Sequence, residues 1–419
     1  ETLSFSVLLW HCVNLTTMGD RIPIPQSPEA VNKALLEKIL SLYNKREIEV
    51  VEFSSESAVE EGENHLSLVL AVQLKCKHDK SKIHKFIAKL PPTNPMLRGF
   101  AMKSQLHKKE IAFYKEVYPK MEKLLKKHGN PYSLTIPKLV YADHDETGYV
   151  IVFEDARQHN YKMLDKSDSL TIDQILLIIQ ELAKFHALSH ALSEDIATEF
   201  PEFKYNSLDA QILHQPGMLE DRIDDFLGVL KKAGLPQEAI QPMERFKSAA
   251  KDRYLEAIRD NPPTMGLVHG DAWRNNVLYG DREDIMLLDF QMVKRGNFLL
   301  DLCYLLVTST DLKFRTAQRE RILQHYYAHL CQYTGALKCP LDTGSYPRSR
   351  LVEDYEKLKY YSVITGVICL PFMLLKNKSQ SAEKMAANMT RCVEVLEELK
   401  MASGDMNLQT SLKSMKITE

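Results

Sequence analysis

The stretch that decides the fold is residues 268–276, Val-His-Gly-Asp-Ala-Trp-Arg-Asn-Asn, together with Asp289-Phe290-Gln291 further along the chain. The first segment holds a carboxylate, Asp271, and an amide, Asn276, at the two ends of one polar loop. The second segment adds another carboxylate after an apolar run. The chemistry of this region therefore depends on whether the chain brings the two segments together.

Strand periodicity on both sides of the loop predicts that it does. Short apolar segments at 266–268 and 277–279 flank the loop, and turn-forming residues precede the next apolar run. We therefore expect a β-hairpin over residues 276–290, which would return Asp289 toward Asn276.

A carboxylate at the end of a buried strand needs compensation, because burying a lone charge costs on the order of several kcal/mol. Magnesium would supply it, since this ion takes oxygen ligands from one or two protein groups and completes its shell with substrate phosphates and water. Asp289 and Asn276 fit the ligand roles. Asp271 lies on the other side of the loop, where it could accept a hydrogen bond from an incoming hydroxyl, so we predict it as the catalytic base of a phosphotransferase.

Two charged residues upstream suit a nucleotide site. Lys89 interrupts the apolar strand pattern at 85–90 and is the candidate for binding the α- and β-phosphates. Glu110 falls on an apolar stripe with helical spacing. A carboxylate on a buried face needs a cationic partner, so we expect a Lys89–Glu110 ion pair. The alternative places Glu110 on a helix surface beside Lys108 or Lys109.

These parts follow each other in the order of the kinase signature. His-Gly-Asp with Asn five residues after the Asp resembles the small-molecule kinases of the choline and aminoglycoside kinase superfamily. More narrowly, His-Gly-Asp-x-Trp-x-x-Asn with Asp-Phe-Gln resembles the ecdysteroid kinase-like family. The resemblance covers residues 24–399 and implies an α+β, bilobal protein-kinase-like fold with a β-rich N-terminal lobe and a larger, mainly helical C-terminal lobe. It also implies ATP and Mg²⁺ as cofactors, and it includes His269 in the catalytic motif.

The resemblance assigns further nucleotide contacts that the residues alone would not reveal. Gly62, Asn64 and Ser67 lie in a polar loop between two predicted strands, where composition alone indicates an ordinary hairpin. By resemblance they belong to the phosphate-binding loop. Glu154 and Ala156 follow an apolar strand and correspond, again by resemblance, to the hinge that binds the adenine edge.

Three other ionisable residues have two interpretations each. His186 and His190 stand four apart on a predicted helix that opens with a capping box, a spacing that can bind zinc. Because no Glu lies between them and no third ligand is evident, core histidines are favoured. Asp301 stands among apolar residues and could cap a helix. In kinase-like folds an acid here can instead brace the catalytic loop through backbone amides.

A chain of 419 residues exceeds one ordinary core and predicts two lobes. Met18 is a candidate start residue, in which case residues 1–17 would not be native. The expected parts are an N-terminal extension at 1–29, a nucleotide-binding N-lobe at 30–157, a catalytic C-lobe at 158–404 and a polar tail at 405–419.

Composition limits the classes of partner that the protein is expected to bind. The net charge of −2 argues against a nucleic-acid-binding surface. Seven scattered cysteines without a Cys-x-x-Cys pair indicate reduced thiols. No apolar segment has the length of a transmembrane helix. We therefore expect a cytoplasmic monomer that binds neither nucleic acid nor membrane.

The acceptor is predicted to be a small molecule, because no Ala-Pro-Glu segment follows Asp-Phe-Gln as it does in protein kinases. The resemblance implies an ecdysteroid-type steroid or a xenobiotic alcohol or phenol. Alternatives are a choline- or aminoglycoside-type kinase and a catalytically silent ligand-binding protein with a kinase fold. Residues 208–230 and 351–375 are the candidate lining helices, although the aromatics of the second, including Tyr361 and Phe372, suit a core better than a pocket.

Overall fold

The computed structural model describes residues 22–58, 67–164, 170–375 and 381–404. The chain divides by its internal contacts into two compact units. The first comprises Glu1–Ala101 and Lys138–Asp155, and the second comprises Met102–Pro137 and Ala156–Glu419. The predicted boundary at 157/158 is close to the second crossing point. The segment 102–137, which we expected in the N-lobe, groups with the second unit by its contacts.

The first unit is built on a five-stranded sheet with the order β1-β2-β3-β5-β4, and every pair in it is antiparallel. The elements of this unit are η1 (Pro28–Ala30), α1 (Lys33–Asn44), β1 (Val50–Ser57), β2 (Leu68–Cys76), β3 (Asp79–Leu90), most of α2 (Pro95–Ser104), β4 (Leu139–His144) and β5 (Tyr149–Glu154). The central strand β3 contains the predicted strand at 85–90, so Lys89 lies in the middle of the sheet.

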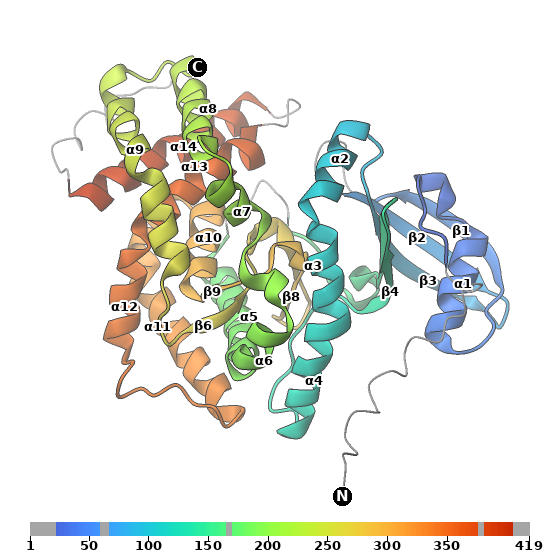
Figure 1. Ribbon diagram of the computed structural model, residues 1–419. Coiled ribbons are helices and arrows are strands. Elements are labelled where there is room, and N and C mark those ends of the chain that lie inside the picture. Colours follow the sequence, from blue (N-terminus) through green and yellow to red (C-terminus); the bar gives the residue numbers. More distant parts are fainter. Residues whose placement is uncertain (1–21, 59–66, 165–169, 376–380, 405–419) are drawn as a thin grey trace, which may run out of the picture. The chain divides into compact units, whose positions relative to one another are not determined.

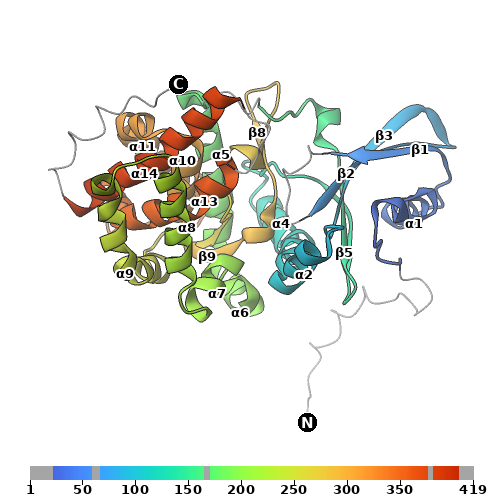
Figure 2. The ribbon, with the colours of Figure 1, turned by 90° about the horizontal axis from the view of Figure 1, so that it is seen from above.

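Helix α1 packs on one face of this sheet (Figure 2). Asn32 caps its N-terminus by accepting a hydrogen bond from the Leu35 backbone N–H at 3.1 Å. Leu36, Ile39 and Leu40 recur at the spacing of one helical face and are buried against the strands. Burial of each such side chain contributes roughly 1.5–3 kcal/mol, so the helix is held mainly by its apolar face.

The second unit is mostly helical (Figure 1). Its helices are α3 (Leu106–Ala112), the π-turn η2 (Phe113–Val117), α4 (Tyr118–Lys127), η3 (Ala156–His159), α5 (Ile172–Ala191), α6 (Ser193–Glu199), η4 (Pro201–Lys204), α7 (Ser207–His214), α8 (Met218–Lys232), α9 (Gln237–Arg259), η5 (Arg274–Asn276), η6 (Phe290–Met292), α10 (Leu299–Ser309), α11 (Leu312–Ala336), α12 (Arg348–Lys357), α13 (Lys359–Leu375) and α14 (Ala382–Ser403). Its strands are β6 (Met265–Val268), β7 (Val277–Tyr279), β8 (Ile285–Leu287) and β9 (Lys294–Asn297).

Helix α5 forms the centre of this unit. It opens with the predicted capping box, in which Thr171 and Gln174 each accept a hydrogen bond from the other's backbone N–H. Ile175, Leu182 and Phe185 on its apolar face are completely buried. Since α5 contacts both α11 and β6, it supports the strand that leads into the His-Gly-Asp loop.

The predicted hairpin over residues 276–290 is confirmed. Strand β7 pairs antiparallel with β8, and Val277 stands opposite Leu287. Next to this pair, the Leu288 backbone N–H donates to the Asn276 carbonyl at 2.9 Å. Strand β6 pairs antiparallel with β9. The two short ribbons therefore bring residues 268–276 and 288–294 to the same place.

In the described part of the chain, no single helix is both long and apolar enough to cross a membrane. Two pairs of helices that meet at a bend, α5 with α6 and α12 with α13, pass that test together by length and composition.

Candidate functional site: the His-Gly-Asp loop and its support

The turn at Gly270 depends on glycine for two reasons. Its φ of +77° lies in the left-handed region, which favours a residue without Cβ. In addition, a Cβ at this position would stand 2.3 Å from the carbonyl oxygen of Met292, which is a backbone atom and cannot rotate away. The loop therefore lies directly against the segment that follows Asp-Phe-Gln, and glycine is what permits that approach.

Asp301 holds the loop from behind, as expected of a brace. Its Oδ2 accepts a hydrogen bond from the His269 backbone N–H at 2.6 Å, and its Oδ1 accepts one from Gly270 N–H at 2.8 Å. The alternative of a helix cap is wrong, because the N-cap of α10 is Phe298. Burial alone would raise the pKa of Asp301, but its hydrogen bond with His186, the electrostatic effect of the neighbouring His186 and His269 rings and the Gly270 amide hold that pKa below its usual value.

His186 belongs to this support and not to a metal site. Its Nε2 lies 3.0 Å from Asp301 Oδ2, its Nδ1 lies 2.9 Å from the Tyr326 hydroxyl, and its ring stacks on Phe298. With Nε2 donating to the carboxylate, Nδ1 accepts from the phenol, so both ring nitrogens are used. Among the described residues no group of three or more His, Cys, Asp or Glu could hold a metal ion.

His269 is completely buried and faces the backbone. Its Nε2 lies 2.9 Å from the Leu288 carbonyl oxygen, and its Nδ1 accepts from the Asp271 N–H at 3.3 Å. These two contacts require the neutral ring with the proton on Nε2. Burial lowers the pKa of His269 below 6.5, which agrees with that tautomer. The side chain therefore positions the loop and the hairpin, and its role in catalysis stays a prediction.

Asp271 and Asn276 are joined across the loop. The Asn276 Nδ2 donates to Asp271 Oδ2 at 2.8 Å and to the Asp271 carbonyl at 2.9 Å. Both side chains are partly exposed. Because the amide nitrogen is turned toward Asp271, the amide oxygen Oδ1 of Asn276 is its remaining atom of the kind that magnesium prefers.

Tyr304 is a contact that the sequence analysis missed. Its hydroxyl donates to Asp271 Oδ1 at 2.5 Å, so both carboxylate oxygens of Asp271 accept a hydrogen bond. Burial raises the pKa of Tyr304 well above 10, and the neighbouring Asp271 acts in the same direction. The phenol therefore stays protonated and remains a donor. Within the apolar run of α10, an isolated Tyr one turn beyond Asp301 was the only available signal.

Asp289 occupies an unusual backbone conformation at the start of η6, with φ +64° and ψ +71°. Asp tolerates the left-handed region better than most residues, and such residues often lie at functional sites. The Gln291 Nε2 donates to its Oδ2 at 3.2 Å. The Leu288 N–H to Asn276 carbonyl bond places this residue directly after the point where the hairpin closes on Asn276.

After Asp289 the chain has no long loop, because η6 is followed directly by β9 and α10. This agrees with the prediction that the kinase activation segment is missing.

Phe290 fixes the same turn from its other side. Its ring stacks on Phe113 with centroids 4.1 Å apart and planes at 6°, and it meets Tyr114 and Phe185 edge-on. Glu110, one turn before Phe113, is 2% exposed. The apolar stripe predicted around Glu110 is therefore confirmed as a buried face, and it packs against the Asp-Phe-Gln turn.

Two of the residues predicted to contact the nucleotide, Lys89 and Ser67, belong to the first unit. Lys89 is 7% exposed and stands opposite Val69 and Ile151 in the sheet. Ser67 is buried, with its hydroxyl 3.0 Å from the Tyr149 hydroxyl, whereas Gly62 and Asn64 lie outside the described residues. Because Lys89 and Glu110 belong to different units, their ion pair stays a prediction.

The hinge candidates lie at the end of β5. Glu154 pairs with Phe86 of β3, and its carboxylate accepts from Lys138 Nζ at 2.7 Å. Ala156 begins η3 and is buried. Backbone recognition of adenine by these residues stays a prediction.

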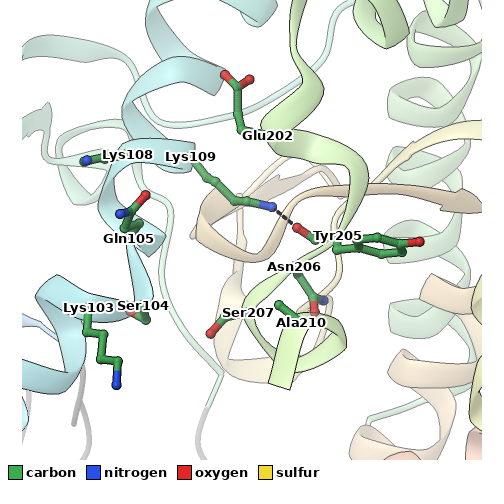
Figure 3. Close-up of a pocket in the computed structure, with 10 residues that line it drawn as sticks. All are labelled: Lys103, Ser104, Gln105, Lys108, Lys109, Glu202, Tyr205, Asn206, Ser207 and Ala210. Carbon is green, nitrogen blue, oxygen red and sulfur yellow. Dashed lines mark hydrogen bonds between the residues drawn. The ribbon is translucent and has the colours of Figure 1, made fainter. Parts of the chain in front are cut away.

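A pocket of about 460 Å³ lies elsewhere in the second unit (Figure 3). Its polar wall comes from the start of α3, with Lys108 and Lys109, and from the segment before α7, with Tyr205 and Asn206. The Lys109 Nζ donates to the Tyr205 carbonyl and, at 3.3 Å, to that of Val293. Burial lowers the pKa of Lys109 to about 8. None of the residues predicted for catalysis or metal binding lines this pocket.

A second structural feature that the sequence analysis missed is a buried ion pair. Lys294 of β9 donates to Asp209 Oδ1 of α7 at 2.7 Å, and both side chains are almost completely buried. The Tyr254 hydroxyl donates to the same oxygen at 2.7 Å.

A unit with an antiparallel five-stranded sheet and a helical unit that carries a braced His-Gly-Asp loop and an Asp-Phe-Gln hairpin define the class of protein-kinase-like folds. Within that class, the model of the ecdysteroid kinase-like family matches residues 61–339, more than half of the chain. The chain therefore belongs to the ecdysteroid kinase-like family.

Individual proteins are similar to this chain at low identity. An uncharacterized kinase-like protein of Caenorhabditis elegans is 21% identical over 217 residues, which cover 50% of this chain and 53% of that protein. The chain thus matches about half the length of this curated relative.

Solved structures with a similar fold include a choline kinase from Streptococcus pneumoniae (14% identity, 87% and 98% of the two chains, TM-score 0.44). Another is an ethanolamine kinase from Plasmodium vivax (13%, 89% and 91%, TM-score 0.43).

Proposed function

We propose that this protein is an ATP- and Mg²⁺-dependent small-molecule kinase that phosphorylates a hydroxyl group of a hydrophobic acceptor. The observation that carries the proposal is the joined Asp271–Asn276 pair beside the Asp289 turn, held in place by Asp301 and His269. Family membership supports the same reaction class. An ecdysteroid-type steroid or a xenobiotic alcohol or phenol is the acceptor we favour, and the cytoplasm is the location we favour.

The donor set suits magnesium. Asn276 offers an amide oxygen and Asp289 a carboxylate, which leaves most of an octahedral shell to phosphate oxygens and water. Bound there, the ion would neutralise charge on the β- and γ-phosphates. No other ligand type is needed, and the two residues come from the two ends of one hairpin.

The reaction then follows from the positions of the groups. Asp271 accepts the proton of the acceptor hydroxyl, the acceptor oxygen bonds to the γ-phosphorus, and the bond from that phosphorus to the bridging oxygen breaks to release ADP. In such a loose transition state, positioning and electrostatic stabilisation supply most of the rate. This is consistent with how firmly the loop is held, since both carboxylate oxygens and the backbone N–H of Asp271 have hydrogen-bond partners.

The competing function is a ligand-binding protein that keeps the fold without turnover. Asp271→Asn should abolish transfer and spare nucleotide affinity, whereas Asp289→Asn should also weaken binding of magnesium-nucleotide. Transfer to ecdysone, para-nitrophenol and choline would be followed by mass spectrometry, and nucleotide binding by calorimetry. Asp281→Asn, an exposed position in the turn of the same hairpin, is the matched control. Nucleotide binding without transfer to any acceptor, in the wild type as in Asp271→Asn, would favour the silent protein.

A further inference from the structure

One face of α13 runs from the core of the second unit to its surface. Tyr361, Thr365, Cys369 and Phe372 follow each other at intervals of four, four and three residues, so they share one side of the helix. Tyr361 and Thr365 are 5% and 3% exposed, Cys369 is partly exposed, and Phe372 is 45% exposed. We call these four residues the α13 face.

The inner end of the α13 face is anchored. Tyr361 stacks on Tyr254 with centroids 5.6 Å apart, and the Lys294 ammonium lies 6.0 Å from the centre of its ring. Tyr254 and Lys294 both bond to Asp209. This end is therefore part of the core, as the sequence predicted for Tyr361.

The middle of the α13 face touches the candidate base through one side chain. The Cys369 Sγ lies 3.8 Å from the Tyr304 hydroxyl as a donor, and the Tyr304 hydroxyl in turn donates to Asp271 Oδ1. Helices α10 and α13 pack along each other, so this contact is supported on both sides. Cys369 on the α13 face is therefore connected to the Asp271 carboxylate, which would accept the proton, through two successive hydrogen bonds.

The outer end is apolar and partly exposed to solvent. Phe372 is one of the few large apolar side chains of the described chain that are more than a third exposed, and the sequence analysis favoured a core position for it. Ile368, Pro371 and Met373 beside it are only partly covered. This exposed apolar surface begins one helical turn beyond Cys369, which contacts Tyr304, and it lacks the charges found in the lysine-lined pocket, so it suits an apolar ligand.

We propose that the outer end of the α13 face, Cys369 and Phe372, is the acceptor-binding surface, with the apolar body of the acceptor on Phe372 and its hydroxyl at Asp271, and that Tyr304 is the residue that positions Asp271. This inference rests on the proposed kinase function and gives it an acceptor class: apolar alcohols and phenols. Tyr304 does not touch the reacting atoms. It holds one oxygen of the carboxylate, while Asn276 holds the other.

The test uses the full chain with ATP and Mg²⁺ and measures kcat and KM for ecdysone and para-nitrophenol. Phe372→Ala should raise the acceptor KM roughly tenfold, because about 1.4 kcal/mol of apolar contact is lost, and should leave the KM for ATP unchanged. Met401→Ala is the control: it is 57% exposed and adjoins Ala402, whose carbonyl binds Lys359 and Tyr360 at the other end of α13.

Tyr304→Phe should lower kcat by about tenfold with little change in acceptor KM. A variant that merely loosened the fold would not lower kcat while leaving the acceptor KM unchanged. Thermal melting of each variant establishes that it is folded.

Binding without turnover separates this inference from the proposed function. Trp273 lies in the loop two residues after Asp271 and is the fluorescence probe with which acceptor binding would be followed. Binding of ecdysone that Phe372→Ala weakens, without transfer, would overturn the kinase and support the surface. Unchanged acceptor KM and binding in Phe372→Ala, or an increase in KM with Lys108→Ala instead, would overturn the surface and place the acceptor in the lysine-lined pocket.

Discussion

Two aspartates of the second unit, Asp209 and Asp301, are each 0% exposed, and the protein compensates their charges in different ways. Asp209 is paired with the ammonium of Lys294, accepts the Tyr254 hydroxyl and, in the capping box of its own helix, accepts one backbone amide, that of Asn206. Asp301 has no Lys or Arg partner among the described residues. It accepts two backbone amides and a ring N–H of His186.

The difference shows that the partners of a buried carboxylate, and not its burial, indicate what it does. The ion pair of Asp209 joins α7 to β9, and the single backbone amide that Asp209 accepts belongs to the N-cap of its own helix. The backbone amides of His269 and Gly270, two consecutive residues, both donate to Asp301. This fixes the conformation of the loop, because both N–H groups must point toward the same carboxylate. Asp209 therefore ties helices together, whereas Asp301 shapes the loop that carries Asp271.

Removing the ammonium group of Lys294, which pairs with Asp209, should have the largest effect on stability. Lys294→Ala leaves the Asp209 carboxylate buried without its ion-pair partner, which should lower the free energy of unfolding by about 3–5 kcal/mol in urea denaturation. Lys247→Ala is the control, since its pair with Asp224 is largely exposed and contributes roughly 0–1 kcal/mol.

The double variant Asp209→Leu/Lys294→Met tests whether the ion pair does more than join the two elements. If the pair only joins elements, an apolar replacement of similar volume should restore most of the lost stability. A double variant as unstable as Lys294→Ala would show that the ion pair has a more specific role than we assign to it.

Replacing Asp301 should lower the reaction rate as well as the stability. Asp301→Asn keeps the size of the side chain but loses the charge and turns one N–H group toward the loop, at about 2–3 kcal/mol of stability. Misplacing Asp271 by about 1 Å should reduce kcat of the folded protein by roughly 100-fold. Asp209→Asn, measured the same way, should lose stability without a comparable loss of kcat. Equal losses of kcat in the two variants would remove the distinction between them.

The sequence predicted the loop better than its surroundings. The positions of Asn276 and Asp289 could be predicted because a hairpin between short apolar strands has a local pattern, and Asp301 was noticed because one acid among apolar residues needs an explanation. Asp209 begins an ordinary amphipathic helix, and its partner Lys294 lies 85 residues away, so no local pattern connects them. Tyr304 was missed for the same reason: its contact with Asp271 exists only after α10 has packed.

Gly270→Ala tests how closely the braced loop approaches the segment after Asp-Phe-Gln. A left-handed alanine costs about 1 kcal/mol, and the clash with the Met292 carbonyl should raise the total to about 2–3 kcal/mol. Gly129→Ala has nearly the same φ, +75°, and nothing within 4 Å of the added Cβ. The difference between the two variants in urea denaturation measures the contact alone, and equal effects would mean that the loop can move away from Met292.

The smallest effect concerns pH and His269. Its pKa is lowered in the folded protein by burial, so as pH falls below 6.5 the unfolded chain takes up a proton that the folded chain does not. The free energy of unfolding therefore falls with decreasing pH from this group, by at most about 1.4 kcal/mol per pH unit, and is unaffected by it well above pH 6.5. Replacing the ring in His269→Gln should flatten this slope, whereas His214→Gln, at an exposed position, should not. Asp301 affects the free energy of unfolding in a separate pH range. Because its pKa in the folded protein lies below 3.8, its stabilising contribution is lost only as pH falls below that value. A slope near pH 6 that persists in His269→Gln would assign it to another buried histidine.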